Sequence, residues 1–249
     1  MDPTTPLPPV PTDVASFPPL DPDDYPNLDE LVTEDGKPME NIFVEKQYRL
    51  LTEPLYSSWS GPGEGRRFLA LANVGWFYAF KQPPLVPDAL LSLDAAPAGD
   101  LRVKAGRSYF QWLIGKPPEL AIEIVSDRRG GEAEYKLRQY ARQGLLYYVI
   151  WDPDDLLGGG VLRAFVLQHG QYAPIEPGWL PQVGLGLTLW PGTFEGQTET
   201  WLRWCHRDGH VIPTGAEQAE EERRRADQAE DTVRRLEEQL RALGQEPEV

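Results

Sequence analysis

The stretch "ELAIEIVSDRRGGEAEYKLRQYARQGLLYYVIWD", Glu119–Asp152, contains two kinds of residue pattern. "LAIEIVS" from Leu120 and "LLYYVIWD" from Leu145 are short apolar runs, typical of buried strands. Between them, "EAEYKLRQYARQG" has apolar residues at helical spacing and ends in Gly144, a residue that commonly terminates helices. We therefore predict strand, helix and strand in succession. Glu123 stands in the middle of the first strand, where an ionised carboxylate needs a partner.

The residues on either side of this stretch extend the pattern. An amphipathic helix is predicted over 39–59, and apolar runs over 68–80 and 84–94 indicate further buried strands. The segment 155–175 is typical of strands joined by Gly-rich turns. This order favours an α/β (α+β) fold with a mixed β-sheet core flanked by helices.

Composition divides the chain into three parts. Residues 1–40 hold ten prolines and ten acidic residues against one lysine, which predicts a flexible or loosely docked arm. Residues 41–212 are rich in apolar and aromatic side chains and form the predicted domain. A long helix rich in Ala, Glu, Arg and Leu follows over 215–243.

Charge and cysteine content narrow the class of protein. The net charge of −15 argues against a generic nucleic-acid coat, although a metal site needs local carboxylates of its own. The single cysteine, Cys205, excludes an internal disulfide. No apolar run is long enough for a membrane span, and we expect a cytoplasmic protein.

The C-terminal helix carries a narrow apolar stripe. From Ala226 the apolar residues recur at steps of three and four, the seam of a heptad repeat. This spacing predicts a coiled coil and a homodimer through 215–243. The alternative is a solvated helix without a partner.

Two acidic residues on separate strands are candidates for metal ligands. Side chains alternate along a strand, so Asp88 shares a face with Leu90, and Glu123 shares one with Ala121. If the two strands are neighbours in register, Asp88 and Glu123 lie close together. Close carboxylates repel unless one is protonated or a cation lies between them, and oxygen ligands suit Mg²⁺ or Mn²⁺. The following helix can deliver Lys136 to the same place.

The motifs "ENIFVEKQ", "PDALLS", "ELAIEIVS" and "KLRQYARQGLLYYVIWDP" give the segment 41–152 a family resemblance. It resembles the Uma-two family of putative restriction endonucleases, whose core is that of the PD-(D/E)xK nucleases. The resemblance implies a restriction-endonuclease-like fold and metal-dependent hydrolysis of phosphodiester bonds in nucleic acid, with DNA as the expected substrate.

The resemblance also implies roles for individual residues. Asp88 and Glu123 match the motif acids that bind the metal. The superfamily usually has a lysine two residues after the glutamate, where this chain has Val125, and Lys136 matches the lysine that replaces it. Two further positions match less specific features of the family. These are Gln139, which would line the pocket, and Glu45, which would hold a metal-bound water or a second ion.

Each candidate also has a structural interpretation. Asp88 after a proline is typical of a turn, Glu123 and Lys136 can form a purely structural ion pair, and Glu45 is typical of a solvated helix face. The loop "SDRRGGE", 126–132, can face a phosphate or simply connect strand and helix. Two other functions therefore stay open: a nuclease-like binding or regulatory module without catalysis, and a coiled-coil-dimerised interaction scaffold.

Overall fold

The computed structural model describes residues 41–63, 65–126 and 131–242. The predicted N-terminal arm lies outside the described residues. The contacts between Cα atoms divide the chain between Asn41 and Ile42, and the fold described below belongs to the second unit. The division into arm, domain and C-terminal helix stays a prediction.

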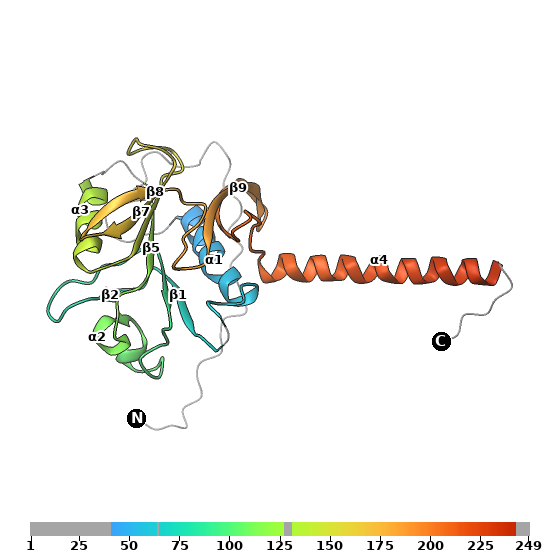
Figure 1. Ribbon diagram of the computed structural model, residues 1–249, viewed down its shortest axis with the longest axis horizontal. Coiled ribbons are helices and arrows are strands. Elements are labelled where there is room, and N and C mark those ends of the chain that lie inside the picture. Colours follow the sequence, from blue (N-terminus) through green and yellow to red (C-terminus); the bar gives the residue numbers. More distant parts are fainter. Residues whose placement is uncertain (1–40, 64, 127–130, 243–249) are drawn as a thin grey trace, which may run out of the picture. The chain divides into compact units, whose positions relative to one another are not determined.

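A six-stranded mixed sheet forms the centre of the domain (Figure 1). Within it β5 (Leu120–Ile124) and β6 (Tyr147–Trp151) run parallel, joined by α3 (Gly131–Arg142), and the other neighbours are antiparallel. The predicted strand, helix and strand are thus confirmed, with the helix as the crossover that a parallel pair requires. In sheet order the strands are β1 (Phe68–Ala72), β3 (Ala89–Leu93), β5 (Leu120–Ile124), β6 (Tyr147–Trp151), β7 (Leu162–Gln168) and β8 (Gln171–Ile175).

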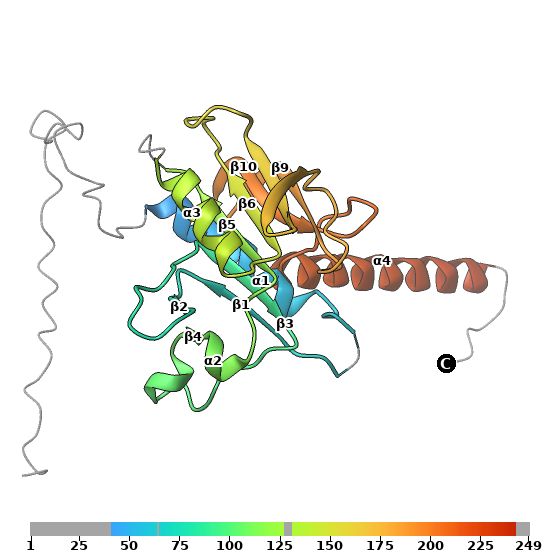
Figure 2. The ribbon, with the colours of Figure 1, turned by 60° about the vertical axis from the view of Figure 1, so that its left-hand side comes forward.

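Different elements cover the two faces of the sheet (Figure 2). On one face α1 (Ile42–Ser57) and the hairpin of β9 (Gly186–Phe194) and β10 (Gln197–Cys205) enclose the larger apolar core. On the other, α3 closes a second core that is rich in aromatic rings. The mixed sheet flanked by helices that the sequence predicted is therefore confirmed.

Two predicted strands are shorter than the apolar runs that indicated them. The run 68–80 divides, because β1 ends at Ala72 and Asn73 turns the backbone with a φ of 51°. The following β2 (Trp76–Phe77) pairs with β4 (Tyr109–Phe110) in a separate two-stranded sheet. In the run 84–94, only the second half forms the strand β3. Two short helices flank β4 in the chain: η3 (Lys104–Gly106) precedes it and α2 (Gln111–Ile114) follows it.

The predicted C-terminal helix is confirmed as α4 (Gly215–Ala242). A capping box starts it: Glu217 donates its backbone N–H to Thr214 Oγ1 at 3.1 Å, and Thr214 donates its own to Glu217 Oε2 at 2.7 Å. None of its residues is buried in the described chain, and pairing into a coiled coil stays a prediction. Among the described residues, no helix has both the length and the apolar character to cross a lipid bilayer.

Candidate active site

The register of the sheet brings the two candidate metal ligands together. The antiparallel pair β3 and β5 matches Ala89 with Ile122. Continued by one residue, this register sets Asp88, just before β3, opposite Glu123. The predicted adjacency of the two acids follows from this pairing, and both lie at the end of the sheet where β5 and β6 finish.

Two hydrogen bonds hold the Asp88 carboxylate. Tyr48 on α1 donates its hydroxyl to Oδ1 at 2.8 Å. The backbone N–H of Ile124, next to Glu123, donates to Oδ2 at 2.6 Å. Asp88 also accepts at its main-chain carbonyl from the N–H of Asn73 at 3.1 Å, which ties it to the end of β1. Asp88 is thus fixed from three directions, by a helix, a strand and a turn.

The Glu123 carboxylate takes both of its partners from α3. Lys136 Nζ lies 2.8 Å from Oε2, and the Tyr140 hydroxyl donates to Oε1 at 2.6 Å. The two residues are four apart in sequence and therefore lie on one face of the helix. Glu123 is only 6 % exposed, so these contacts answer the question of how the apolar strand carries a carboxylate.

Lys136 and Tyr140 do not fully offset the cost of ionising the buried Glu123 carboxyl. Burial and the nearby charge of Asp88 raise the pKa of Glu123 to about 8, although Lys136 and Tyr140 both act to lower it. Burial, together with the charge of Glu123, also raises the pKa of Tyr140 well above its ordinary value. Glu123 is therefore a carboxyl group that would hold its charge more readily beside a further cation.

The chemistry of these donors fits a divalent ion. Each of the four carboxylate oxygens of Asp88 and Glu123 accepts a hydrogen bond from a described residue, and a carboxylate oxygen has a second lone pair to offer. Among the described residues no group of three or more His, Cys, Asp or Glu side chains could hold a metal ion. Mg²⁺ is commonly bound by one or two carboxylates together with water and phosphate oxygens, which is the kind of site two acids can form.

Glu45 makes its contacts with Arg49 and not with the paired acids. Glu45 is exposed on α1 and accepts the guanidinium of Arg49, with Nη2 at 2.7 Å from Oε1. Arg49 also pairs with Glu195 at 2.8 Å, which makes a surface network. The contacts of the described residues therefore give no support to the predicted role of Glu45 near the metal. The solvated, ion-paired alternative describes its surroundings better.

The structure also locates the remaining predicted residues. Val125 packs against the aromatic-rich core under α3, so Lys136 from the helix is the lysine that reaches Glu123. Gln139 is half-buried on α3, and it is its neighbour Tyr140 that donates a hydrogen bond to Glu123. Residues 127–130, at the centre of the predicted phosphate-facing loop, lie outside the described residues.

Sequence reasoning missed two tyrosines that orient the acids. Tyr140 carried a local signal, since it stands one helical turn after Lys136 and follows it onto the same face. Its ring stacks on Trp76 with centroids 5.9 Å apart, which fixes the hydroxyl. Tyr48 gave no comparable signal, because its contact with Asp88 joins residues forty positions apart in sequence.

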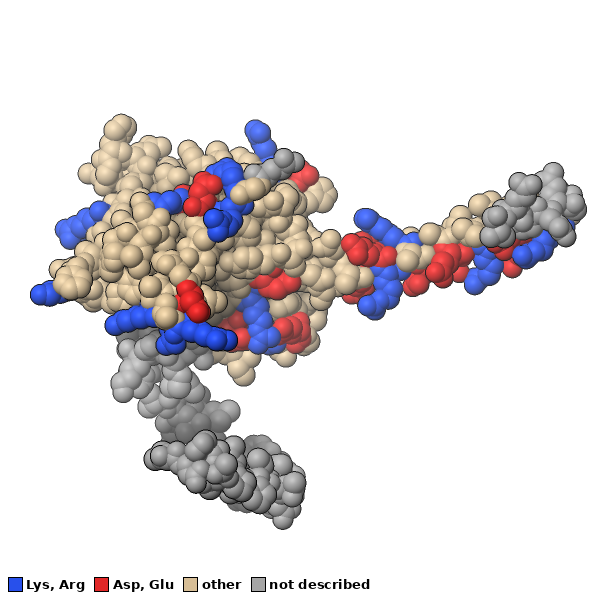
Figure 3. Space-filling view, turned by 90° about the horizontal axis from the view of Figure 1, so that it is seen from below, with Lys and Arg blue, Asp and Glu red and all other residues tan. Residues whose placement is uncertain are grey.

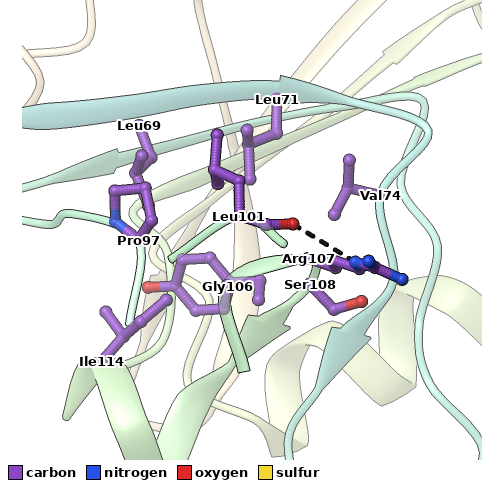
Figure 4. Close-up of a pocket in the computed structure, with 10 residues that line it drawn as sticks. Leu69, Leu71, Val74, Pro97, Leu101, Gly106, Arg107, Ser108 and Ile114 are labelled. Carbon is purple, nitrogen blue, oxygen red and sulfur yellow. Dashed lines mark hydrogen bonds between the residues drawn. The ribbon is translucent and has the colours of Figure 1, made fainter. Parts of the chain in front are cut away.

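An apolar cavity of about 280 Å³ lies beside β1 (Figure 4). Leu69 and Leu71 of β1 line it together with Tyr109 and Ile114. Arg107 stands at the polar side, where its Nε donates to the Leu101 carbonyl at 3.2 Å. Its lining contains neither of the paired acids, so the cavity is a separate feature of the domain.

Comparisons with known proteins identify a family and similar solved structures. The model of the family Uma2, described as "Putative restriction endonuclease", matches residues 37–191. No curated protein matches the chain. The chain is similar to a solved "putative nuclease belonging to DUF820" from Anabaena variabilis ATCC 29413, with a TM-score of 0.40 and 16 % identity. That alignment covers 57 % of this chain and 73 % of the other.

Proposed function

Because this chain belongs to the Uma2 family of putative restriction endonucleases, we propose that it is a metal-dependent endonuclease acting on nucleic acid, foremost on DNA. The observation that supports this is the cluster of Asp88, Glu123 and Lys136, in which a buried and a half-buried carboxylate from neighbouring segments stand beside one ammonium group. Two acids and a lysine at the end of a sheet are the parts that phosphodiester hydrolysis with a metal requires.

Asp88 and Glu123 would hold Mg²⁺ or Mn²⁺ through their carboxylate oxygens. When bound, such an ion lowers the pKa of a coordinated water and neutralises charge that develops on the phosphate. The chain's own hydrogen bonds prepare for this. Tyr48 and Tyr140 restrict the rotation of the two carboxylates, so that these side chains lose little conformational entropy when a metal ion binds.

Lys136 is the natural candidate for handling the phosphate or the attacking water. Its side chain is 31 % exposed while that of Glu123 is 8 % exposed, so the ammonium group borders on solvent and the carboxylate does not. In this position it can orient a water with one N–H and stabilise negative charge on a phosphate oxygen. It would thus perform the task of the lysine that Val125 replaces.

A basic segment supports nucleic acid as the substrate. Residues 101–118 contain four lysines and arginines and no acidic residue, in a chain whose net charge is −15. Three of the four, Arg102, Lys104 and Arg107, are exposed, and Trp112 beside them is 49 % exposed. On the side of the domain seen in Figure 3, Lys and Arg side chains lie along the margin farthest from α4. Basic and aromatic side chains together suit a phosphate backbone with stacked bases.

We further propose that a second copy of this chain pairs through α4. Val233 and Leu236 are each 54 % exposed, although both belong to the heptad seam that starts at Ala226. A helix of the same sequence offers a complementary apolar stripe. A dimer would bring two nuclease domains to one duplex, an arrangement that suits the cutting of both strands.

A plasmid assay tests the proposed activity. Purified protein is incubated with supercoiled DNA and with RNA, in Mg²⁺, in Mn²⁺ and in EDTA. We expect metal-dependent nicking that disappears in Asp88→Ala and Glu123→Ala. A matched control is Glu199→Ala, which removes an exposed acid on β10 and should retain full activity. Glu45→Ala is expected to behave like this control, since Glu45 faces Arg49 rather than the paired acids.

The same assay separates the other functions. DNA binding without nicking by the unmodified chain would support a catalytically inactive binding module, an alternative that Val125 at the motif lysine position favours. A concentration-dependent dimer with neither binding nor nicking would support the interaction scaffold. Nicking that persists in both Ala variants would remove the acidic pair from the mechanism.

A further inference from the structure

Arg163 lies in the same row of the sheet as the paired acids. In the β5–β6 register Glu123 stands beside Ile150, and in the β6–β7 register Ile150 stands opposite Arg163. The side chain of Ile150 belongs to the core beneath α3, and paired residues of neighbouring strands face the same side. Arg163 and Glu123 therefore face α3 with a single strand between them, so their backbones are about 10 Å apart.

Two of the three guanidinium nitrogens of Arg163 lack acceptors among the described residues. Its Nε and Nη2 are buried and have no hydrogen-bond partner among the residues that the structure describes. Buried donors of this kind are rare in folded proteins, and each requires a specific explanation. The guanidinium lies against the β6–β7 connection, since a Cβ on Gly159 would come within 3.4 Å of Nη1. This connection leaves the sheet at the end where the acids lie.

The charges of this row act on a common neighbour. Burial raises the pKa of Tyr148 well above its ordinary value; Glu123 and Asp88 raise it further, and Arg163 lowers it. Tyr148 in turn packs on Tyr140, with ring centroids 5.1 Å apart. The acids and Arg163 therefore border on the same cluster of aromatic rings, which includes Tyr148 and Tyr140.

We propose that Arg163 forms a phosphate-binding subsite beside the acidic pair. A guanidinium offers a planar fork of N–H donors that matches two oxygens of a phosphate. The acids of the row are already engaged, Glu123 by Lys136 and Tyr140, and Asp88 by Tyr48 and Ile124. An anion brought by the substrate would give the guanidinium the acceptors that the chain does not supply. The ligand is a phosphodiester of nucleic acid, so this subsite rests on the proposed function.

The test uses the full chain and the variant Arg163→Met. Two probes report on binding without catalysis: inorganic phosphate, followed by the change in melting temperature, and a fluorescein-labelled DNA oligonucleotide, followed by anisotropy in EDTA. We expect Arg163→Met to bind the oligonucleotide about tenfold more weakly, as for the loss of one charged hydrogen bond. The shift in melting temperature with phosphate should disappear.

Stability distinguishes a ligand-binding arginine from a structural one. Arg163→Met should melt no lower than the unmodified chain without ligand, because it removes donors that have no partner. Arg66→Met is the matched control: it removes the same charge from a pair with Asp94 at 2.6 Å and should leave both probes unaffected. Should Arg163→Met fold poorly, Arg163→Lys retains the charge without the fork and is expected to weaken binding by a smaller factor.

Three outcomes decide the question. Equal binding of both probes by Arg163→Met and the unmodified chain overturns the subsite. A large drop in melting temperature for Arg163→Met and Arg163→Lys without an effect on binding overturns it as well. If the unmodified chain cuts DNA and Arg163→Met cuts it with unchanged KM and kcat, the subsite fails while the proposed function stands. If no DNA is cut but phosphate binding depends on Arg163, the subsite stands and the enzyme proposal fails.

Discussion

Two arginines with buried guanidinium atoms, on different sheets of the domain, differ in how completely their charge is matched. At the start of α4, Arg203 of β10 is 1 % exposed and forms a bidentate pair with Glu217, at 3.0 and 2.6 Å. Its Nη2 also donates to the Ile212 carbonyl, and the guanidinium lies 4.8 Å from the Trp190 ring. Within the described residues only its Nε lacks a partner. Arg163, near the acidic pair, has no such set of acceptors.

Two carboxyl groups show the same contrast in their pKa: Glu217, which pairs with Arg203, and Glu123, which lies in the sheet row of Arg163. Burial opposes the charge of Glu217, yet the hydrogen bonds from Arg203 and Thr214 outweigh it and lower the pKa of Glu217 below its ordinary value. At Glu123, burial and Asp88 prevail and raise the pKa to about 8. The Arg203–Glu217 cluster, whose polar groups pair with one another, holds the start of α4 in place. The cluster around Glu123 and Arg163 leaves polar groups without partners, which is typical of a binding site.

The largest expected effect is the loss of stability when Arg203 at the start of α4 is replaced. Arg203→Met should lower the free energy of unfolding by roughly 2–4 kcal/mol, because Glu217 and the Ile212 carbonyl lose their partner. Urea denaturation measures it. Arg225→Met is the control, since it removes an exposed partner of Glu221, and no measurable change is expected. If Arg203→Met proved as stable as the unmodified chain, the contrast between the two clusters would fail.

The next largest effect is expected from removing the Tyr140 hydroxyl, which donates to Glu123. Tyr140→Phe should retain the fold, because its ring stays packed between Trp76 and Tyr148. Nicking activity should fall about 10- to 100-fold, as for other partners that orient metal ligands. Tyr172→Phe is the matched control, since that hydroxyl donates to the Leu145 carbonyl instead of an acid. Unchanged activity in Tyr140→Phe would contradict the orienting role.

The raised pKa of Glu123 predicts a pH dependence of stability. Its folded pKa of about 8 exceeds the ordinary value of 4.5, so the folded chain binds the extra proton between these values. The contribution of Glu123 to stability is complete below the lower pKa and is lost as pH rises through the higher one. The free energy of unfolding falls in this window by up to about 1.4 kcal/mol per pH unit from this group.

Urea titrations at several pH values between 5 and 9 measure this effect. Glu123→Gln has no proton to lose and should show a flatter dependence. Addition of Mg²⁺ should flatten that of the unmodified chain as well, because a cation favours the ionised carboxylate. Parallel curves for the two proteins would show that Glu123 titrates normally.

The smallest effect on the domain is expected from the far part of α4. Val233→Asp together with Leu236→Asp should abolish self-association in sedimentation while leaving the melting temperature of the domain unchanged. Both residues are exposed and belong to the helix beyond the Arg203 cluster. Glu238→Gln, off the apolar seam, should dimerise like the unmodified chain. A monomer at all concentrations in the unmodified chain would refute the coiled coil.

Local patterns were sufficient for the elements that bury apolar residues periodically. The strand, helix and strand around Glu123 and the helix α4 follow from spacing that acts within a few residues. Asp88 beside Glu123 was predictable as well, once the two runs were taken for neighbours. The pattern was less informative at strand ends, where Asn73 interrupts an apolar run that looked continuous.

Other features depend on contacts that no local pattern encodes. Tyr48 reaches Asp88, and Arg163 joins the row of the acids, only because the sheet order brings separate segments together. Glu45 matched a family feature and yet pairs with Arg49 on the surface.

The sequence by itself determined which segments become strands and helices, and which of them carry an acid or a base. Hydrophobic periodicity decides this, because it acts along the chain. Only the tertiary structure decided which of those charges are matched. Matching depends on burial and on partners from other elements, and both exist only after the sheet has formed.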